Sequence, residues 1–191
     1  MMWFTADLHL GDTNILHDMD RPFGSVEEMN RKVIDVINEC VTADDRLYIL
    51  GDFTYRLPLA DAVHLRERIE CKNVTLIRGN HDGDWEDPDA PQIWEDVRDY
   101  LEIAPGYAKG HRLVMSHYPM LSWNGKARGA IMLHGHIHLT YGANIPREHQ
   151  YGQTRIVNCY ERFVLDLPDK PDPRRHSLIE RWKQFNRTGH F

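Results

Sequence analysis

The chain has 191 residues, of which 41% are hydrophobic, 27% charged and 10% aromatic, and this composition excludes a disordered, collagen-like or coiled-coil protein. A net charge of -6 disfavours non-specific binding of nucleic acid. No apolar run approaches the roughly 20 residues of a membrane span, the first residues do not resemble a signal peptide, and the three cysteines are far apart, so we expect a cytoplasmic protein that does not contact a membrane.

The first half of the chain alternates between strand-like and helix-like segments. Short apolar runs predict strands at residues 2–6, 46–50 and 73–78. Apolar residues at helical spacing predict helices over 26–41 and 58–69. Ser25 is placed to cap the first of these helices, because Glu28 follows three residues later. This order of elements indicates a βαβαβ arrangement.

The second half is mostly β in character. Turns that contain Gly or Pro separate predicted strands at residues 97–103, 112–116, 130–134 and 154–159. A final helix is predicted at about 175–187. No internal repeat or low-complexity linker divides the chain, so we expect a single domain over residues 1–191.

Five polar clusters directly follow predicted strands. They are Asp7-Leu8-His9, Gly51-Asp52, Gly79-Asn80-His81-Asp82, Ser116-His117-Tyr118-Pro119 and Gly135-His136-Ile137-His138. In open α/β sheets ligands bind outside the carboxyl ends of the strands, so the clusters could converge on one place. Asp7 and His9 are two residues apart, as are His136 and His138, so each pair would point to one side of an extended segment.

The side-chain types of these clusters favour a metal centre. Carboxylates and neutral imidazoles bind divalent metals. With His81 set aside, the candidate ligands are Asp7, His9, Asp52, Asn80, His117, His136 and His138. Seven ligands are too many for one tetrahedral zinc and suit two ions that share a bridging ligand. Each cluster alone could be an ordinary turn or cap, but five of them at five strand ends argue against that explanation.

In this order the clusters resemble the motif set of the calcineurin-like metallophosphoesterases, a superfamily of binuclear-metal phosphatases, phosphodiesterases and nucleases. That set runs D-x-H, G-D, G-N-H-D or G-N-H-E, H and G-H-x-H, and the match covers about residues 2–160. The resemblance implies an α/β (α+β) fold of four layers. Two mixed β-sheets would pack face to face, with helices outside.

The resemblance also implies a role for each candidate residue. One metal would be bound by Asp7, His9 and His138, and the other by Asn80, His117 and His136, with Asp52 as the bridge. His81 would meet the substrate, and Asp82 would orient it. Two divalent ions are expected, with manganese favoured among manganese, iron, zinc, nickel and cobalt.

The predicted activity is hydrolysis of small phosphate monoesters or diesters by a hydroxide that bridges the two ions, with His81 protonating the leaving group. The alternative is a nuclease or a polynucleotide end-processing phosphatase with the same metal site. The acidic stretch 82–102 would repel long nucleic acids if it overhangs the site, whereas the basic stretch 105–128 and the C-terminal tail favour them.

Two further classes fit the sequence less well. A non-catalytic interaction module would be expected to lose metal ligands, and an oxygenase with two histidines and one carboxylate needs a single iron. The chain could be a monomer or a homodimer. Arg21, Arg78 and Arg128 are candidate phosphate clamps, although a surface or ion-pair role is expected for each.

Overall fold

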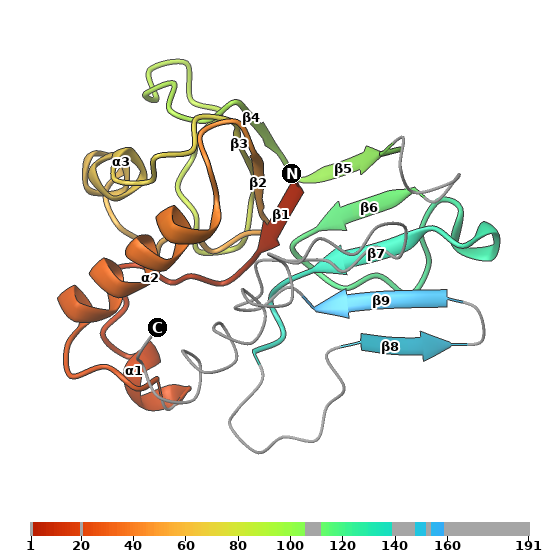
Figure 1. The fold of residues 1–191 in the computed structure, drawn as a ribbon, viewed down its shortest axis with the longest axis horizontal. Helices are drawn as coiled ribbons and strands as arrows, with labels where there is room; N and C mark the ends of the chain where they lie inside the picture. Colours follow the sequence, from red (N-terminus) through yellow and green to blue (C-terminus); the bar gives the residue numbers. More distant parts are fainter. Residues whose placement is uncertain (1, 20, 106–111, 139–147, 152–153, 159–191) are drawn as a thin grey trace.

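Two β-sheets form the centre of the molecule (Figure 1). The computed structural model describes residues 2–19, 21–105, 112–138, 148–151 and 154–158. The first sheet is parallel, in the order β1 (Met2–Thr5), β2 (Arg46–Ile49), β3 (Val74–Ile77) and β4 (Asp96–Arg98). The second sheet is mixed, in the order β5 (Tyr100–Ile103), β6 (Leu113–Ser116), β7 (Ile131–His134), β9 (Thr154–Asn158) and β8 (Glu148–Tyr151).

Helices lie on the side of the first sheet that faces away from the second (Figure 1). They are α1 (Ile15–Asp18), α2 (Val26–Cys40) and α3 (Leu59–Glu67). Ser25 caps α2 as predicted, because its hydroxyl accepts the Glu28 N–H at 3.2 Å. The Glu28 carboxylate accepts the N–H of Gly24 rather than that of Ser25. A short 3₁₀ helix, η1 (Lys126–Arg128), precedes β7.

Successive side chains along the central strands enter different cores. Trp3 of β1 and Leu47 of β2 pack against the helices. Their neighbours Phe4 and Tyr48 are partners in the strand register, stack at 5.1 Å between ring centroids, and face the second sheet. The second sheet contributes Leu113, Met115, Ile131 and Leu133 to this core. Both faces of these strands are therefore covered, which explains why they read as continuous apolar runs and not as alternating ones.

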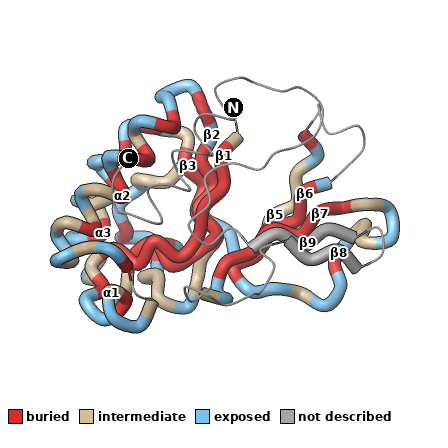
Figure 2. The backbone as a smooth tube through the Cα atoms, turned by 60° about the horizontal axis from the view of Figure 1, so that its bottom comes forward, coloured by how far each residue is buried: buried red, intermediate tan, exposed pale blue. Residues whose placement is uncertain are grey.

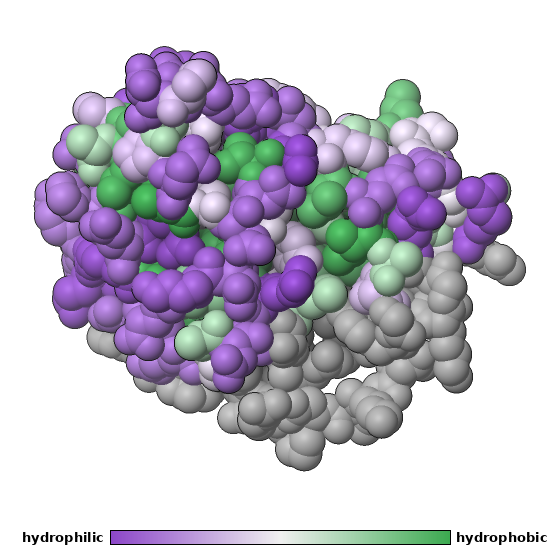
Figure 3. Space-filling view, turned by 90° about the horizontal axis from the view of Figure 1, so that it is seen from above, coloured by the Kyte–Doolittle hydropathy of each residue, from purple (hydrophilic) through white to green (hydrophobic). Residues whose placement is uncertain are grey.

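Burial follows this layering. In Figure 2 the buried backbone runs through β1, β2 and β3 and continues in β6 and β7. On the outer face of the second sheet, Trp123 packs with Val114 and Met132. The space-filling view in Figure 3 shows mainly hydrophilic residues among those that are coloured, with hydrophobic ones in separate patches. In the described part of the chain no helix has the length and apolar character needed to span a bilayer.

The predicted fold class is confirmed, with two differences in detail. The first sheet is parallel throughout its four strands and not mixed. The predicted strand 97–103 is two strands, β4 and β5, which belong to different sheets and meet at Asp99. The chain passes from one sheet to the other within an unbroken strand-like pattern, so the sequence carries no turn signal there. Strand β8 and helix α1 were not predicted, and the helix predicted at 175–187 lies outside the described residues.

Candidate metal centre

The five polar clusters follow β1, β2, β3, β6 and β7, as predicted. Strands β1 to β3 are parallel to one another, and so are β6 and β7, so within each sheet the carboxyl ends lie at one edge. The two edges meet, because the Nε2 atoms of His9 and His138, 129 residues apart in the chain, lie 3.1 Å from each other. The clusters therefore form one site from both sheets.

Four of the predicted ligands form a tight group on one side of the site. Asp7, His9, Asp52 and His138 each offer a ligand atom, and these atoms all lie within 4.8 Å of one another. Nε2 of His138 is 3.4 Å from Oδ1 of Asp7, and Nε2 of His9 is 3.5 Å from Oδ2 of Asp52. Asp7, His9 and Asp52 are almost fully buried, so this group closes the inner end of the site.

The other predicted ligands lie around His117. Its Nε2 is 3.1 Å from Oδ1 of Asn80, and its ring centroid is 5.1 Å from that of His136. The same Nε2 is 3.5 Å from Oδ2 of Asp52. Because Oδ2 of Asp52 is also 3.5 Å from His9, this carboxylate lies between the two groups.

The contacts of the histidines fit a cation site. Nδ1 of His117 lies 2.9 Å from the carbonyl oxygen of Leu50, which can only accept, so Nδ1 donates and Nε2 faces the oxygens of Asn80 and Asp52. Burial, together with His138 and the guanidinium group of Arg21, lowers the pKa of His9 to about 2, so this ring is neutral. Its Nδ1 is 3.2 Å from Asp12, a carboxylate placed as the outer partners of metal-bound histidines commonly are. Ring nitrogens of His9 and His117 thus lie beside carboxylate and amide oxygens, and this set of ligand atoms fits divalent metals.

The backbone of the site is held in an uncommon conformation. Among the described residues, five non-glycine residues have positive φ, and four of them are predicted ligands: Asp7 (56°), His9 (51°), Asp52 (53°) and His136 (66°). Such angles store strain of about 1–3 kcal/mol each. The prediction that Asp7 and His9 lie on an extended segment was therefore wrong in its geometry, although both side chains reach the same group.

Three glycines of the clusters leave space for ligands from other strands. A Cβ atom on Gly51 would lie 2.2 Å from Nδ1 of His117, and one on Gly79 would lie 2.1 Å from Oδ1 of Asp52. A Cβ atom on Gly135 would lie 2.6 Å from Oδ2 of Asp7. Any side chain at these three positions would therefore displace a candidate ligand.

Arg21 acts differently from a phosphate clamp. Its guanidinium group is buried, and it donates to the carbonyl oxygens of Asp7 at 2.8 Å and Leu8 at 2.7 Å. It thereby holds the strained backbone of the first cluster. Arg78 forms a forked ion pair with Asp99, in line with the ion-pair role expected for it.

Asp82 also differs from its predicted role. Its two oxygens accept backbone N–H groups of Asp52, Phe53 and Gly79 at 2.8–2.9 Å, so it fixes the turns that carry the ligands. Burial raises the pKa of Asp82 to about 6, against the effect of these hydrogen bonds. Nδ1 of His81 is buried and finds no hydrogen-bond partner among the described residues. The His81 ring packs instead against Tyr55, at 4.6 Å between centroids, a contact that the sequence analysis missed.

Comparison with known proteins gives consistent matches along most of the chain. The family model for calcineurin-like phosphoesterases matches residues 2–187. The uncharacterized protein MJ1445 of Methanocaldococcus jannaschii is 32% identical over 173 residues, covering 87% of this chain and 88% of that protein. The gene 66 protein of Mycobacterium phage D29 is 29% identical over 160 residues, covering 72% and 78% of the two chains. Among solved structures, the protein of unknown function AQ665 from Aquifex aeolicus has a similar fold, with a TM-score of 0.62, 22% identity and 84% and 89% coverage.

Proposed function

The chain belongs to the calcineurin-like phosphoesterase family and is a metal-dependent phosphoester hydrolase, and we propose that it hydrolyses monoesters or diesters of small molecules with two divalent ions. The observation that carries the proposal is the position of Asp52, whose Oδ2 atom is 3.5 Å from His9 on one side and 3.5 Å from His117 on the other. A single carboxylate between two sets of candidate ligands is the arrangement in which one side chain can bridge a pair of ions.

Each proposed ion has its own set of side chains. One ion would be held by Asp7, His9 and His138, and the other by Asn80, His117 and His136. Asp52 would contact both ions. When bound, two such ions supply a hydroxide nucleophile at neutral pH and neutralise charge on the phosphoryl oxygens. Manganese is our first choice of metal, and iron, zinc, nickel and cobalt suit the same donors.

In this proposal His81 assists the departure of the leaving group. Its backbone N–H donates to Oδ1 of Asp52 at 2.9 Å, which ties it to the proposed bridge. Its ring is only partly buried and lies 5.5 Å from that of His9, between centroids. An imidazole in this position can give a proton to a departing alkoxide near neutral pH. The ring of Tyr55, packed against it, limits its rotation.

The proposal is tested by metal analysis of the purified chain together with hydrolysis of bis(p-nitrophenyl) phosphate and p-nitrophenyl phosphate. We expect two ions per chain, and hydrolysis that stops on chelation and returns with manganese. A variant at His64, a largely exposed histidine on α3, controls for loss of an imidazole outside the site. One ion per chain, or hydrolysis that survives chelation, would refute the binuclear mechanism. The ratio of the two rates separates diesterase from monoesterase activity.

A further inference from the structure

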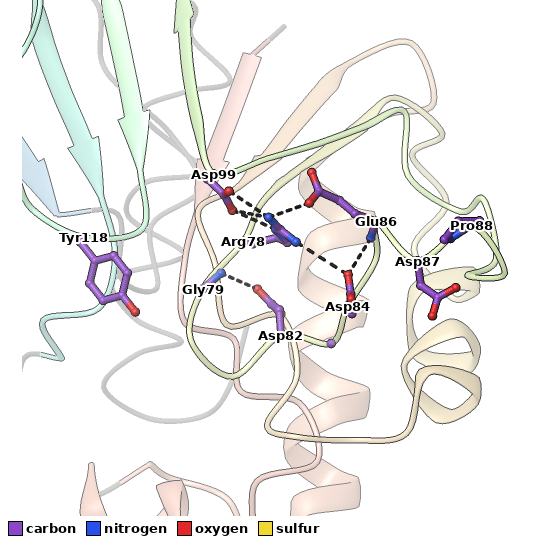
Figure 4. A pocket seen from close by; sticks show the side chains of 10 residues that line it. Arg78, Gly79, Asp82, Asp84, Glu86, Asp87, Pro88, Asp99 and Tyr118 are labelled. Atoms are coloured by element: carbon purple, nitrogen blue, oxygen red, sulfur yellow. Dashed lines mark hydrogen bonds and ion pairs between the residues drawn. The ribbon is translucent and has the colours of Figure 1, made fainter.

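A pocket of about 640 Å³ lies beside the candidate metal centre (Figure 4). Gly79 and Asp82, which belong to the third polar cluster, form part of its wall. The segment after that cluster forms the opposite wall, and Tyr118 from the loop after β6 closes the side toward the second sheet. We call this space the acidic pocket and define it by Arg78, Asp84, Glu86, Asp87, Asp99 and Tyr118.

Tyr118 connects the acidic pocket to the metal centre. Its ring lies 4.7 Å from that of His136 and 5.0 Å from that of His117, between centroids. Its hydroxyl group donates to Oδ1 of Asn80 at 3.4 Å. The ring is nevertheless 48% exposed, so much of its surface is open to a ligand. A substrate whose phosphorus lies at the centre can therefore place its leaving group along Tyr118 and into the pocket.

The charge of the acidic pocket is strongly negative. Apart from Asp82, whose oxygens accept backbone N–H groups, the lining includes four carboxylates, from Asp84, Glu86, Asp87 and Asp99, and the single guanidinium group of Arg78. That group is already engaged, since it forms a fork with Asp99 at 2.9 Å and an ion pair with Glu86 at 3.0 Å. Three negative charges therefore remain uncompensated next to the path that a leaving group would take. A phosphate-rich leaving group such as a polynucleotide would meet repulsion there, whereas a cationic one would be attracted.

We propose that the acidic pocket is the leaving-group subsite of this phosphoesterase, that Tyr118 contacts the leaving group, and that the carboxylates select leaving groups without negative charge. This inference rests on the proposed function and narrows its substrate class to esters of neutral or cationic alcohols. An aromatic face also attracts cations, so Tyr118 on one side of the pocket and the carboxylates on the other make cationic alcohols the favoured case.

The expected selectivity follows from simple electrostatics. We take the three uncompensated charges of the acidic pocket at an assumed separation of about 8 Å from the leaving group. In a water-like medium they change the binding affinity by roughly tenfold for each unit of charge on the ligand. At physiological salt the Debye length is about 8 Å, which reduces the factor to roughly threefold. A cationic and an anionic leaving group differ by two units of charge. The kcat/KM values of their esters should therefore differ by roughly a hundredfold at low ionic strength.

The experiment compares aryl phosphates that differ in one para substituent: trimethylammonio, acetyl or carboxylate. They are offered to the manganese-loaded chain as monoesters and as methyl diesters, and kcat/KM is measured at low and at physiological salt. The charge-neutral triple variant D84N/E86Q/D87N should lose most of the preference for the cationic ester. Comparing variant with wild type cancels the intrinsic reactivity of each ester.

A matched control removes three acids elsewhere. The triple variant D35N/D44N/E70Q makes the same change in net charge. Asp35 is exposed on α2, and Asp44 and Glu70 are exposed before β2 and β3, at the end of the first sheet opposite the site. This control should keep the wild-type preference. Equal loss of preference in both triple variants would show an effect of overall charge and would overturn the assignment of the pocket.

Two further measurements separate this inference from the proposed function. In the metal-free chain, ligand-detected NMR should show that 4-(trimethylammonio)phenol binds more tightly than 4-hydroxybenzoate, and equal binding would overturn the inference.

Y118A should raise KM for aryl esters roughly three- to tenfold, because it removes the aromatic ring that contacts the leaving group. Y118F keeps that ring, so its KM should stay close to the wild-type value. An unchanged KM in Y118A would refute the contact. If the chain hydrolyses none of these esters, it is instead the proposed function that is refuted.

Discussion

Replacing Arg21 with Met tests whether a buried arginine holds the first ligand cluster in its strained conformation. The guanidinium group donates at 2.8 Å to the carbonyl oxygen of Asp7 and at 2.7 Å to that of Leu8. Hydrogen bonds from a charged group contribute about 1.5–3 kcal/mol each. Methionine keeps most of the buried stem, so we take the lower end and expect a loss of about 3 kcal/mol in the free energy of unfolding.

The same variant should also weaken metal binding. Asp7 has a φ of 56°, a conformation that costs about 1–3 kcal/mol and that the free backbone would abandon. If Asp7 relaxes, the manganese dissociation constant should rise by roughly 5- to 150-fold. The assays are urea denaturation and manganese titration, with R31M on the exposed face of α2 as the control. An R21M protein that loses less than about 1 kcal/mol and binds manganese as the wild type does would refute this reasoning.

Three other substitutions test separate parts of the site. H81A should lower kcat by roughly 10²–10⁴-fold, most for the poorest leaving groups, while metal analysis still finds two ions; loss of an ion would show that His81 is a ligand. D52A should empty both ion positions, and a D52A protein that retains two ions would remove Asp52 as the bridge. G51A should lower metal content because its Cβ would lie 2.2 Å from Nδ1 of His117, whereas G24A, whose nearest contact is the flexible carboxylate of Glu28 at 3.3 Å, should keep it.

The location of the site could be predicted because the signals were local. Each cluster follows an apolar run directly, and parallel strands bring such ends to one edge of a sheet. The N-terminal cap of α2 was equally readable, since Ser25 and Glu28 lie within one turn. The family followed from the order of the motifs, and the family match confirms it.

What could not be predicted depends on contacts between distant residues. Nothing near Arg21 in the sequence indicates that its guanidinium group reaches back to Asp7. The contacts of Asp82 could not be predicted, because two of the three backbone N–H groups that donate to its oxygens come from a different strand end. The crossing at Asp99 was missed because no turn residue separates β4 from β5, and only the pairing partners show that they belong to different sheets.

Both proposed ion positions draw on both sheets, so the packing between the sheets sets the geometry of the centre. Several hydrogen bonds cross from one sheet to the other at the site itself, and two of them involve the backbone. The ring of His117 donates to the carbonyl oxygen of Leu50, and the backbone N–H of His136 donates to the carboxylate of Asp7 at 3.0 Å. Arg78, at the end of β3, adds a fork to Asp99, where the chain enters the second sheet. Because these contacts hold the candidate ligands in place through protein groups alone, we expect metal binding to require little rearrangement, with the cost of ordering the site met during folding.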